Sequence, residues 1–131
     1  MNQITEPVTI EEMTVSSDHR GTVFNPLPVS ALTGQKNFHM VISQPRAVRG
    51  NHYHRRGTEI LIVAGPATVR IRENGRLRDI VIPGQSIYRL TIAPGISHAV
   101  KHTGPDAGFL LAFNTVAYDP ENPDVVRDIL L

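Results

Sequence analysis

The chain has 131 residues, no cysteine, and 13 basic against 12 acidic residues, for a formal net charge of +1. This length predicts one domain over residues 1–131, with one hydrophobic core and, without cysteine, no disulfide or thiolate site. The balanced charge and the few aromatic residues argue against a nucleic-acid partner. A polar N-terminus and the lack of a long apolar run predict a soluble cytoplasmic protein with no membrane partner.

Short runs rich in Val, Ile, Leu and Thr alternate with Gly and Pro along most of the chain, which is typical of a β-sandwich or β-barrel. We predict strands over residues 36–43, 58–65, 67–73, 77–82, 86–92 and 108–114. Asn74-Gly75 lies between two of these strands and is a strong β-hairpin signal. Further turns are expected at Pro83-Gly84 and Pro94-Gly95. The expected fold class is all-β.

Only the C-terminal end carries helical signals. Asn122 suits an N-cap, Pro123 suits the first helical position, and Asp124 would lie near the positive end of the helix dipole. Apolar residues then fall on one side of such a helix: Val125, Val126, Ile129 and Leu130. We therefore predict a short C-terminal helix.

Two histidines stand one residue apart, at positions 52 and 54. In a strand, His52 and His54 would project from the same face about 7 Å apart, with Tyr53 on the other face. Gly57 permits a turn, after which Glu59 begins the next predicted strand. An antiparallel strand starting there can return its carboxylate to the side of the two imidazoles.

A third histidine, His98, follows the Pro94-Gly95 turn, and His102 comes four residues later on the same strand face. Three imidazoles and one carboxylate suit a divalent first-row metal such as Zn, Mn, Fe, Ni or Co, and leave one or two positions for substrate. A lone pair of strand histidines is more often solvent-facing or satisfied by neighbours. The conjunction of the four residues favours the metal. We predict that His52, His54, Glu59 and His98 bind one divalent ion, with zinc expected first.

The spacing of these residues resembles the two cupin motifs. Residues 50–65 read G-x-H-x-H-x4-E-x5-G, and residues 94–98 read P-G-x-x-H. In metal cupins the matching residues are the ligands, inside a small double-sheet jelly roll. The family often carries Asn four residues after the last ligand, where this chain has His102. The resemblance implies a cupin jelly-roll β-barrel.

A closer resemblance covers nearly the whole chain. The segment DHRG (18–21) is similar to the D-x-R-G opening of deoxysugar 3,5-epimerases and keto-isomerases. RGNHYH (49–54), PGISHAVKHTG (94–104) and FNTVAYDPENPD (113–124) resemble the cupin domain of bifunctional capsular polysaccharide enzymes. There a reductase domain precedes a metal-containing cupin that epimerises a UDP-linked 4-keto-6-deoxy sugar. This sequence has no reductase-like segment, so we expect the cupin part alone.

The resemblance implies an epimerase or isomerase for a nucleotide-linked 4-keto-6-deoxy sugar in surface polysaccharide biosynthesis. Such chemistry needs a Lewis acid to stabilise an enolate and a base to remove a carbon-bound proton. His102 is the candidate base, because its spacing from His98 places it on the barrel-facing side. The alternative for His102 is a structural role, and without metal His52 or His54 would serve as base.

A sugar nucleotide also needs its diphosphate held, and arginine suits bidentate phosphate contacts. Arg20 and Arg49 are the candidates, because they lie inside the family-like motifs. Side chains alternate between the two faces of a strand, so Arg49 and His52, three residues apart, should point to opposite faces. Arg49 therefore reaches the pocket only if Gly50 bends the strand. The metal-free 3,5-epimerases are a weaker match, because their Gln is His54 here and their catalytic Tyr is missing from residues 109–113.

Other functions compatible with the cupin motifs are a sugar-binding or sensing module with a structural metal, a dioxygenase and a simple-sugar isomerase. The DHRG and YDPENPD segments favour the sugar-nucleotide enzyme, because those other cupins do not need them. We further expect a homodimer, with Tyr53 and the chain termini at the interface, because exposed β edges need cover.

Overall fold

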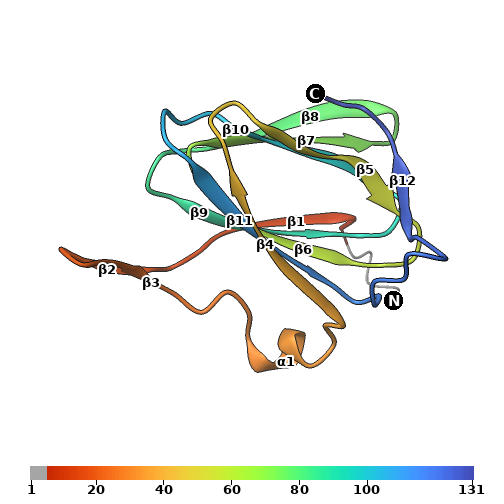
Figure 1. The fold of residues 1–131 in the computed structure, drawn as a ribbon, viewed down its shortest axis with the longest axis horizontal. Helices are drawn as coiled ribbons and strands as arrows, with labels where there is room; N and C mark the ends of the chain where they lie inside the picture. Colours follow the sequence, from red (N-terminus) through yellow and green to blue (C-terminus); the bar gives the residue numbers. More distant parts are fainter. Residues whose placement is uncertain (1–5) are drawn as a thin grey trace.

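The computed structural model describes residues 6–131, which form two facing antiparallel sheets and one short helix (Figure 1). The first half of the chain holds β1 (Val8–Glu12), β2 (Ser16–Asp18), β3 (Gly21–Val23), α1 (Val29–Leu32), β4 (Asn37–Ser43) and β5 (Val48–His54). The second half holds β6 (Glu59–Ala64), β7 (Ala67–Glu73), β8 (Arg76–Ile82), β9 (Ile87–Ile92), β10 (Ser97–His102), β11 (Gly108–Asn114) and β12 (Val125–Arg127). The all-β class is confirmed.

The two large sheets have five strands each. One has the order β1-β9-β6-β11-β4, and the other has the order β12-β5-β10-β7-β8. Figure 1 shows them as the lower and upper layers of a barrel, with β12 closing one end. Because β5, β6 and β10 are interior strands of these sheets, the residues predicted to bind metal lie on well-supported backbone.

The core follows the alternation of the strands. In β7 the side chains of Val69 and Ile71 are fully buried, whereas Thr68 and Arg70 face outward, as period-two patterning requires. Strand β6 is buried along both faces, because its outer face packs under the segment that includes Met13, Phe24 and Leu27. A continuous apolar run therefore marks the central strand of its sheet.

The predicted strand bounds agree with the structure to within a residue at each end. The hairpin at Asn74-Gly75 is also confirmed: φ is 50° at Asn74 and 74° at Gly75, the left-handed conformation of a two-residue β-hairpin turn. Strands β1, β2 and β3 had no clear sequence signal, and α1 is a single turn without a side-chain cap.

The predicted C-terminal helix is wrong. Val125–Arg127 form β12, which pairs antiparallel with β5 through Val125↔His54 and Arg127↔His52. The helical signals were local, but β5 would otherwise be a sheet edge with unpaired backbone groups. Pairing with that edge satisfies the backbone and overrides the local preference.

The hairpin of β2 and β3 projects away from the barrel (Figure 1), and every residue from Ser16 to Val23 is exposed. No helix in residues 6–131 is both long and apolar enough to cross a membrane. Residues 1–5, part of the terminus that we placed at a dimer interface, lie outside the described residues.

Candidate metal centre

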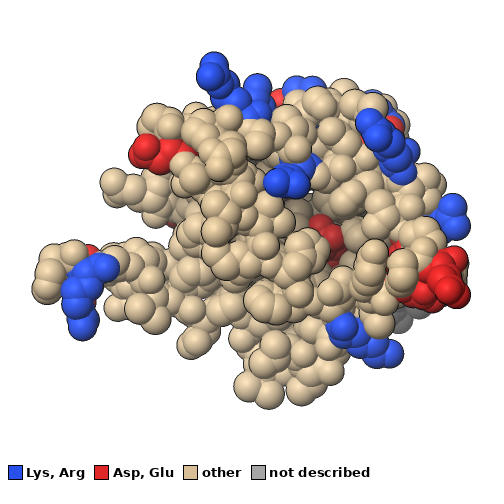
Figure 2. Space-filling view, in the orientation of Figure 1, with Lys and Arg blue, Asp and Glu red and all other residues tan. Residues whose placement is uncertain are grey.

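A cavity of about 480 Å³ opens between the two sheets, and all four predicted metal ligands line it. His52 and His54 come from β5, Glu59 begins β6, and His98 lies near the start of β10. Figure 2 shows an acidic side chain at the bottom of a hollow in the tan surface, with a basic side chain at the rim. The cavity falls within the size range of small-molecule sites.

The four side chains converge on one small volume at the end of the cavity. One ligand atom from each of His52, His54, Glu59 and His98 lies within 4.8 Å of the others. Ligands about 2.0–2.2 Å from a shared ion stand roughly 3–4 Å apart, so the cluster is close to the size that an ion requires. His98 is 1% exposed and Glu59 is 6% exposed, so both groups lie at the buried end of the cavity.

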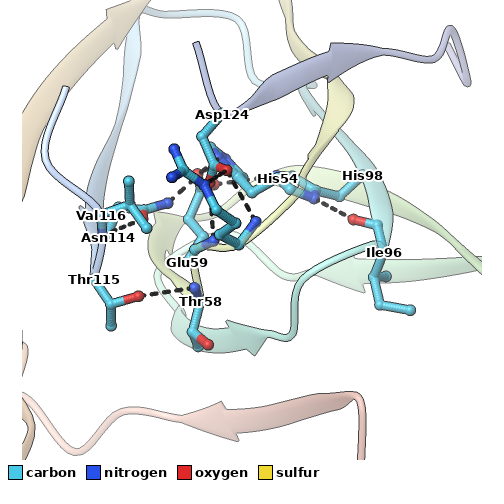
Figure 3. A network of polar contacts seen from close by, with 11 residues as sticks. His54, Thr58, Glu59, Ile96, His98, Asn114, Thr115, Val116 and Asp124 are labelled. Carbon is cyan, nitrogen blue, oxygen red and sulfur yellow. Dashed lines mark hydrogen bonds and ion pairs between the residues drawn. The ribbon is translucent and has the colours of Figure 1, made fainter. Parts of the chain in front are cut away.

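A hydrogen bond orients the His98 imidazole for coordination, and an unsatisfied nitrogen marks the His54 imidazole. Nδ1 of His98 donates to the carbonyl of Ile96 at 2.9 Å, which directs Nε2 toward Glu59, 3.1 Å from Oε1 (Figure 3). A backbone acceptor on the far nitrogen is the usual second partner of a metal-bound histidine. Nε2 of His54 is buried against Glu59 without a hydrogen bond of good geometry in residues 6–131. A cation bound here would satisfy that nitrogen, so the residues fit a metal ion.

The electrostatics favour the ligating forms of these groups. Burial would raise the pKa of the Glu59 carboxyl, but the His54 and His98 imidazoles outweigh burial and hold the pKa well below its usual range. Burial and the neighbouring His98 lower the pKa of His52 to about 4, with Glu59 partly opposing them. At neutral pH the carboxylate is therefore ionised and His52 carries a free lone pair, as metal binding requires.

A β-bulge brings Arg49 into the same cavity. His98 pairs with His52 and Ala99 pairs with Gly50, so Asn51 is an extra residue in β5. Gly50 takes φ of 90° and Asn51 takes φ of 57°. The extra residue shifts the alternation, so Arg49 and His52 both line the cavity. This is the bend at Gly50 that the sequence required for Arg49 to reach the pocket.

The structure does not bring Arg20 to this cavity. Arg20 lies in the exposed turn of the β2–β3 hairpin, where its guanidinium is 2.6 Å from Asp18 and its side chain is 80% exposed. The DHRG motif is therefore an ion-paired turn on a projecting arm in this chain.

His102 also lies apart from the four ligands. Four residues along β10 correspond to about 13 Å, and His102 lines a separate small cavity with Ser43, Val63 and Phe109. Its Nε2 bonds to the carbonyl of Asp106 at 2.9 Å, and its side chain packs against Gly108. The spacing placed His102 on the inner face correctly but did not show how far along the barrel it lies.

Four further residues near the ligands were missed by sequence reasoning. His39 of β4 and Tyr118, in the loop after β11, line the cavity with the ligands. Asn114 and Asp124 approach Nδ1 of His54, at 3.4 Å and 3.9 Å (Figure 3). For His39 a signal existed: within the predicted strand it shares a face with Val41 and Ser43, which point inward. Tyr118, Asn114 and Asp124 lie in the motif of residues 113–124, whose placement needed the fold.

Comparison with solved structures shows the same architecture elsewhere. The capsular polysaccharide assembling protein CapF from Staphylococcus aureus matches with a TM-score of 0.67 and 22% identity, over 90% of this chain and 34% of that one. QdtA, a sugar 3,4-ketoisomerase from Thermoanaerobacterium thermosaccharolyticum in complex with TDP, matches with a TM-score of 0.67 and 18% identity. This match covers 93% of this chain and 88% of that one. ChmJ, a 3'-monoepimerase from Streptomyces bikiniensis in complex with dTDP-quinovose, matches with a TM-score of 0.71 and 18% identity. This match covers 88% of this chain and 67% of that one. These likenesses confirm the cupin jelly-roll fold.

At the level of sequence, a UDP-2-acetamido-2,6-beta-L-arabino-hexul-4-ose reductase from Pseudomonas aeruginosa is 30% identical over 116 residues. The match covers 86% of this chain but only 30% of that protein, so the chain spans about a third of the length of its relative. The model of the polysaccharide biosynthesis C-terminal domain matches residues 16–126. This chain therefore belongs to the polysaccharide biosynthesis C-terminal domain family.

Proposed function

We propose that this domain is a divalent-metal cupin that epimerises or isomerises a nucleotide-linked 4-keto-6-deoxy sugar in surface polysaccharide biosynthesis. The observation that carries the proposal is the convergence of His52, His54, Glu59 and His98 at the bottom of a cavity of ligand size. Support also comes from family membership and from the sugar-modifying enzymes with the same fold. Zinc is the ion that we expect first, with Mn, Fe, Ni and Co as alternatives.

The chemistry is a proton transfer at the carbon beside a ketone. A bound divalent ion supplies Lewis acidity toward the keto oxygen. A base removes the carbon-bound proton, the electron pair moves to the oxygen as an enolate, and a proton then returns to the same or a neighbouring atom. Glu59 and the imidazoles would hold the ion, and the apolar walls formed by Leu61, Val100 and Leu110 would limit water at the reacting carbon.

His39 takes the role of base in this proposal, in place of His102. Its side chain lines the same cavity as the four ligands but is not one of them, so it is free to exchange protons with a sugar. Tyr118, in the loop between β11 and β12, also lines the cavity and is the second group that can return a proton. His102 lines a separate small cavity, where its Nε2 bonds to the Asp106 carbonyl.

The nucleotide diphosphate is assigned to the mouth of the cavity. Arg49 is exposed and lines the cavity beside Gly50, so a sugar near the ligands would place its diphosphate within reach of the guanidinium. Arginine binds phosphate oxygens in a bidentate manner. Arg49→Gln is expected to raise KM for the sugar nucleotide with little change in kcat.

A homodimer is part of the proposal, but through a different surface than Tyr53. The edge at Tyr53 is already covered by β12. Strand β4 is one of the two edge strands of the other sheet and exposes Phe38, Met40 and Ile42 by 55–64%. Arg20 would bind substrate only if the arm of one protomer reached the cavity of its partner. Sedimentation of the wild type and of Met40→Glu tests this dimer.

The test of the function is proton exchange. Protein loaded with zinc is incubated in D2O with UDP- or dTDP-linked 4-keto-6-deoxy sugars, and the ring protons are followed by NMR. Wild type should introduce deuterium beside the ketone, and His98→Ala should not. Absence of exchange with every keto sugar, despite bound metal and bound sugar nucleotide, would indicate a binding module instead.

A further inference from the structure

The last residues of the chain form a strap along the candidate metal centre. We define the C-terminal strap as residues 124–131, which include β12 and run beside β5 and over the ends of β10 and β7 (Figure 1). The strap contacts a residue close in sequence to each of the four ligands. These contacts fall into three groups.

The first group pins the turn between two ligands. The carbonyl of Asp124 accepts from the N–H of Arg55 at 2.8 Å, and its carboxylate accepts from the N–H groups of Arg56 and Gly57, each at 2.9 Å. Residues 55–57 make up most of the four-residue connection between His54 and Glu59. The carboxylate of Asp124 is 10% exposed and lies 3.9 Å from Nδ1 of His54 (Figure 3). One side chain therefore sets the path of the backbone that brings His54 and Glu59 together.

The second group holds the bulge before His52. The side-chain oxygen of Asn51 accepts from the N–H of Leu130 at 2.8 Å and of Leu131 at 3.1 Å, and its amide donates to the Leu131 carbonyl at 3.2 Å. The backbone carbonyl of Asn51 accepts from the N–H of Asp128 at 2.8 Å. Asn51, with φ of 57°, is the extra residue of the bulge that brings Arg49 and His52 to one face.

The third group lies beside His98. The carboxylate of Asp128 accepts from the hydroxyl of Ser97 and from the guanidinium of Arg72, both at 2.6 Å. Ser97 is buried and directly precedes His98. The strap thus ties β5, the 55–57 turn and the first residue of β10 into one unit.

We propose that the C-terminal strap is a positioning element for the four ligands, with Asp124 as its principal residue, so that docking of the strap and binding of the metal stabilise each other. The inference rests on the metal-binding part of the proposed function. Since coupling between two binding events is reciprocal, metal should protect the strap, and loss of a strap contact should weaken metal binding. Asp124 is not one of the four clustered residues, so it acts on them through the backbone of residues 55–57.

The first measurement is zinc affinity of the full chain by competition with a chromophoric chelator. Asp124→Asn keeps the size of the side chain but removes one acceptor charge, and we expect it to weaken zinc binding about 10–100-fold, as for other outer-shell groups. Glu121→Gln neutralises a nearby exposed carboxylate that makes no side-chain hydrogen bond or ion pair in the described chain, and should bind like wild type. Asn51→Gly tolerates the left-handed φ, removes the second group of side-chain contacts and should also weaken binding, which tests the strap if Asp124→Asn does not fold.

The second measurement is amide hydrogen exchange of wild type with and without zinc. Peptides of residues 124–131 and the amides of Arg56 and Gly57 should exchange more slowly when zinc is present, whereas the β7–β8 hairpin should not change. Equal zinc affinity in wild type and a folded Asp124→Asn, or unchanged exchange of the strap, would overturn the inference and leave the proposed function standing. No zinc binding by wild type would overturn both.

Discussion

The backbone of Gly50 lies against the carbonyl oxygen of His98, so close that a Cβ atom on Gly50 would stand 2.8 Å from that oxygen and 3.3 Å from Cα of Ala99. The φ of Gly50 is 90°, which L-residues rarely adopt. The contact joins the strand that carries His52 to the strand that carries His98, at the register shift that turns Arg49 inward. The geometry of the site therefore depends on the absence of a side chain at one position.

Gly50→Ala should accordingly lower the free energy of unfolding by roughly 2–4 kcal/mol, because strain in φ adds to a backbone clash. It should also weaken zinc binding by at least about tenfold, since β5 and β10 must separate. Gly75→Ala is the matched control: φ there is 74°, but nothing lies within 4 Å of the added Cβ. The control should lose about 1 kcal/mol from strain alone and keep its zinc affinity. Equal zinc affinities in the two variants would contradict the role assigned to Gly50.

Metal should stabilise the protein by mass action. At a free zinc concentration of 100 times Kd, the free energy of unfolding should rise by about 2.7 kcal/mol. For a chain of this size, that corresponds to an increase in Tm of roughly 10 °C. Chelation should reverse the increase.

Glu59→Gln is the variant that tests the source of this stabilisation. It removes the only anionic member of the cluster while keeping the shape of the side chain. Zinc should raise its Tm by less than a third of the wild-type increase, measured by scanning calorimetry. A full increase in this variant would place the ion elsewhere on the molecule.

The metal-free protein should lose stability as the pH falls from about 6.5 to about 4. The pKa of His52 is about 4 in the folded state, against an ordinary value of 6.5, and the main cause is burial. Between these two values the unfolded chain binds a proton that the folded chain does not, so the free energy of unfolding decreases as pH falls through this window. Above pH 6.5 His52 is neutral in both the folded and the unfolded state, so its titration no longer lowers the free energy of unfolding. Solvent screening of the partly exposed ring limits this contribution to about 1 kcal/mol.

Urea unfolding of the metal-free protein at intervals from pH 7 to pH 4.5 measures this effect. His52→Asn should show a shallower slope over the same range, because it cannot titrate. A slope as steep as that of wild type would assign the acid sensitivity to other groups.

His39 and His102 should separate clearly in the exchange reaction. His39→Gln should slow deuterium incorporation by roughly 10²–10⁴-fold, the usual contribution of a general base. His102→Gln should change the rate of the folded enzyme by less than tenfold, because its ring is bound to the Asp106 carbonyl in a separate cavity. Both rates are measured with variants shown to be zinc-loaded. A large effect of His102 with a small effect of His39 would return the role of base to His102.

The sequence by itself determined the all-β class, the bounds of six strands, the β-hairpin at Asn74-Gly75 and the identity of the clustered residues. These features depend on short-range rules: alternation with period two, turns that need glycine or asparagine, and histidines that share a strand face. The motif spacing also identified His52, His54, Glu59 and His98 as one cluster. His98 lies on β10, which pairs with β5, but Glu59 reaches the cluster from β6 in the facing sheet, not from an antiparallel partner of β5 as we expected.

Only the tertiary structure decided where the other residues stand. His102 lies on the inner face of β10, as its spacing from His98 predicts, but it is about 13 Å from His98 along the strand. The alternation of side chains predicts the face and not whether two residues can reach the same site. Asp124 carries the signals of a helix start, yet it binds the 55–57 turn because β5 offered an unpaired edge. His39 reaches the cavity from an edge strand of the other sheet. Each of these placements depends on which strands become neighbours, and that is set by the burial and backbone pairing of the whole chain rather than by any local pattern.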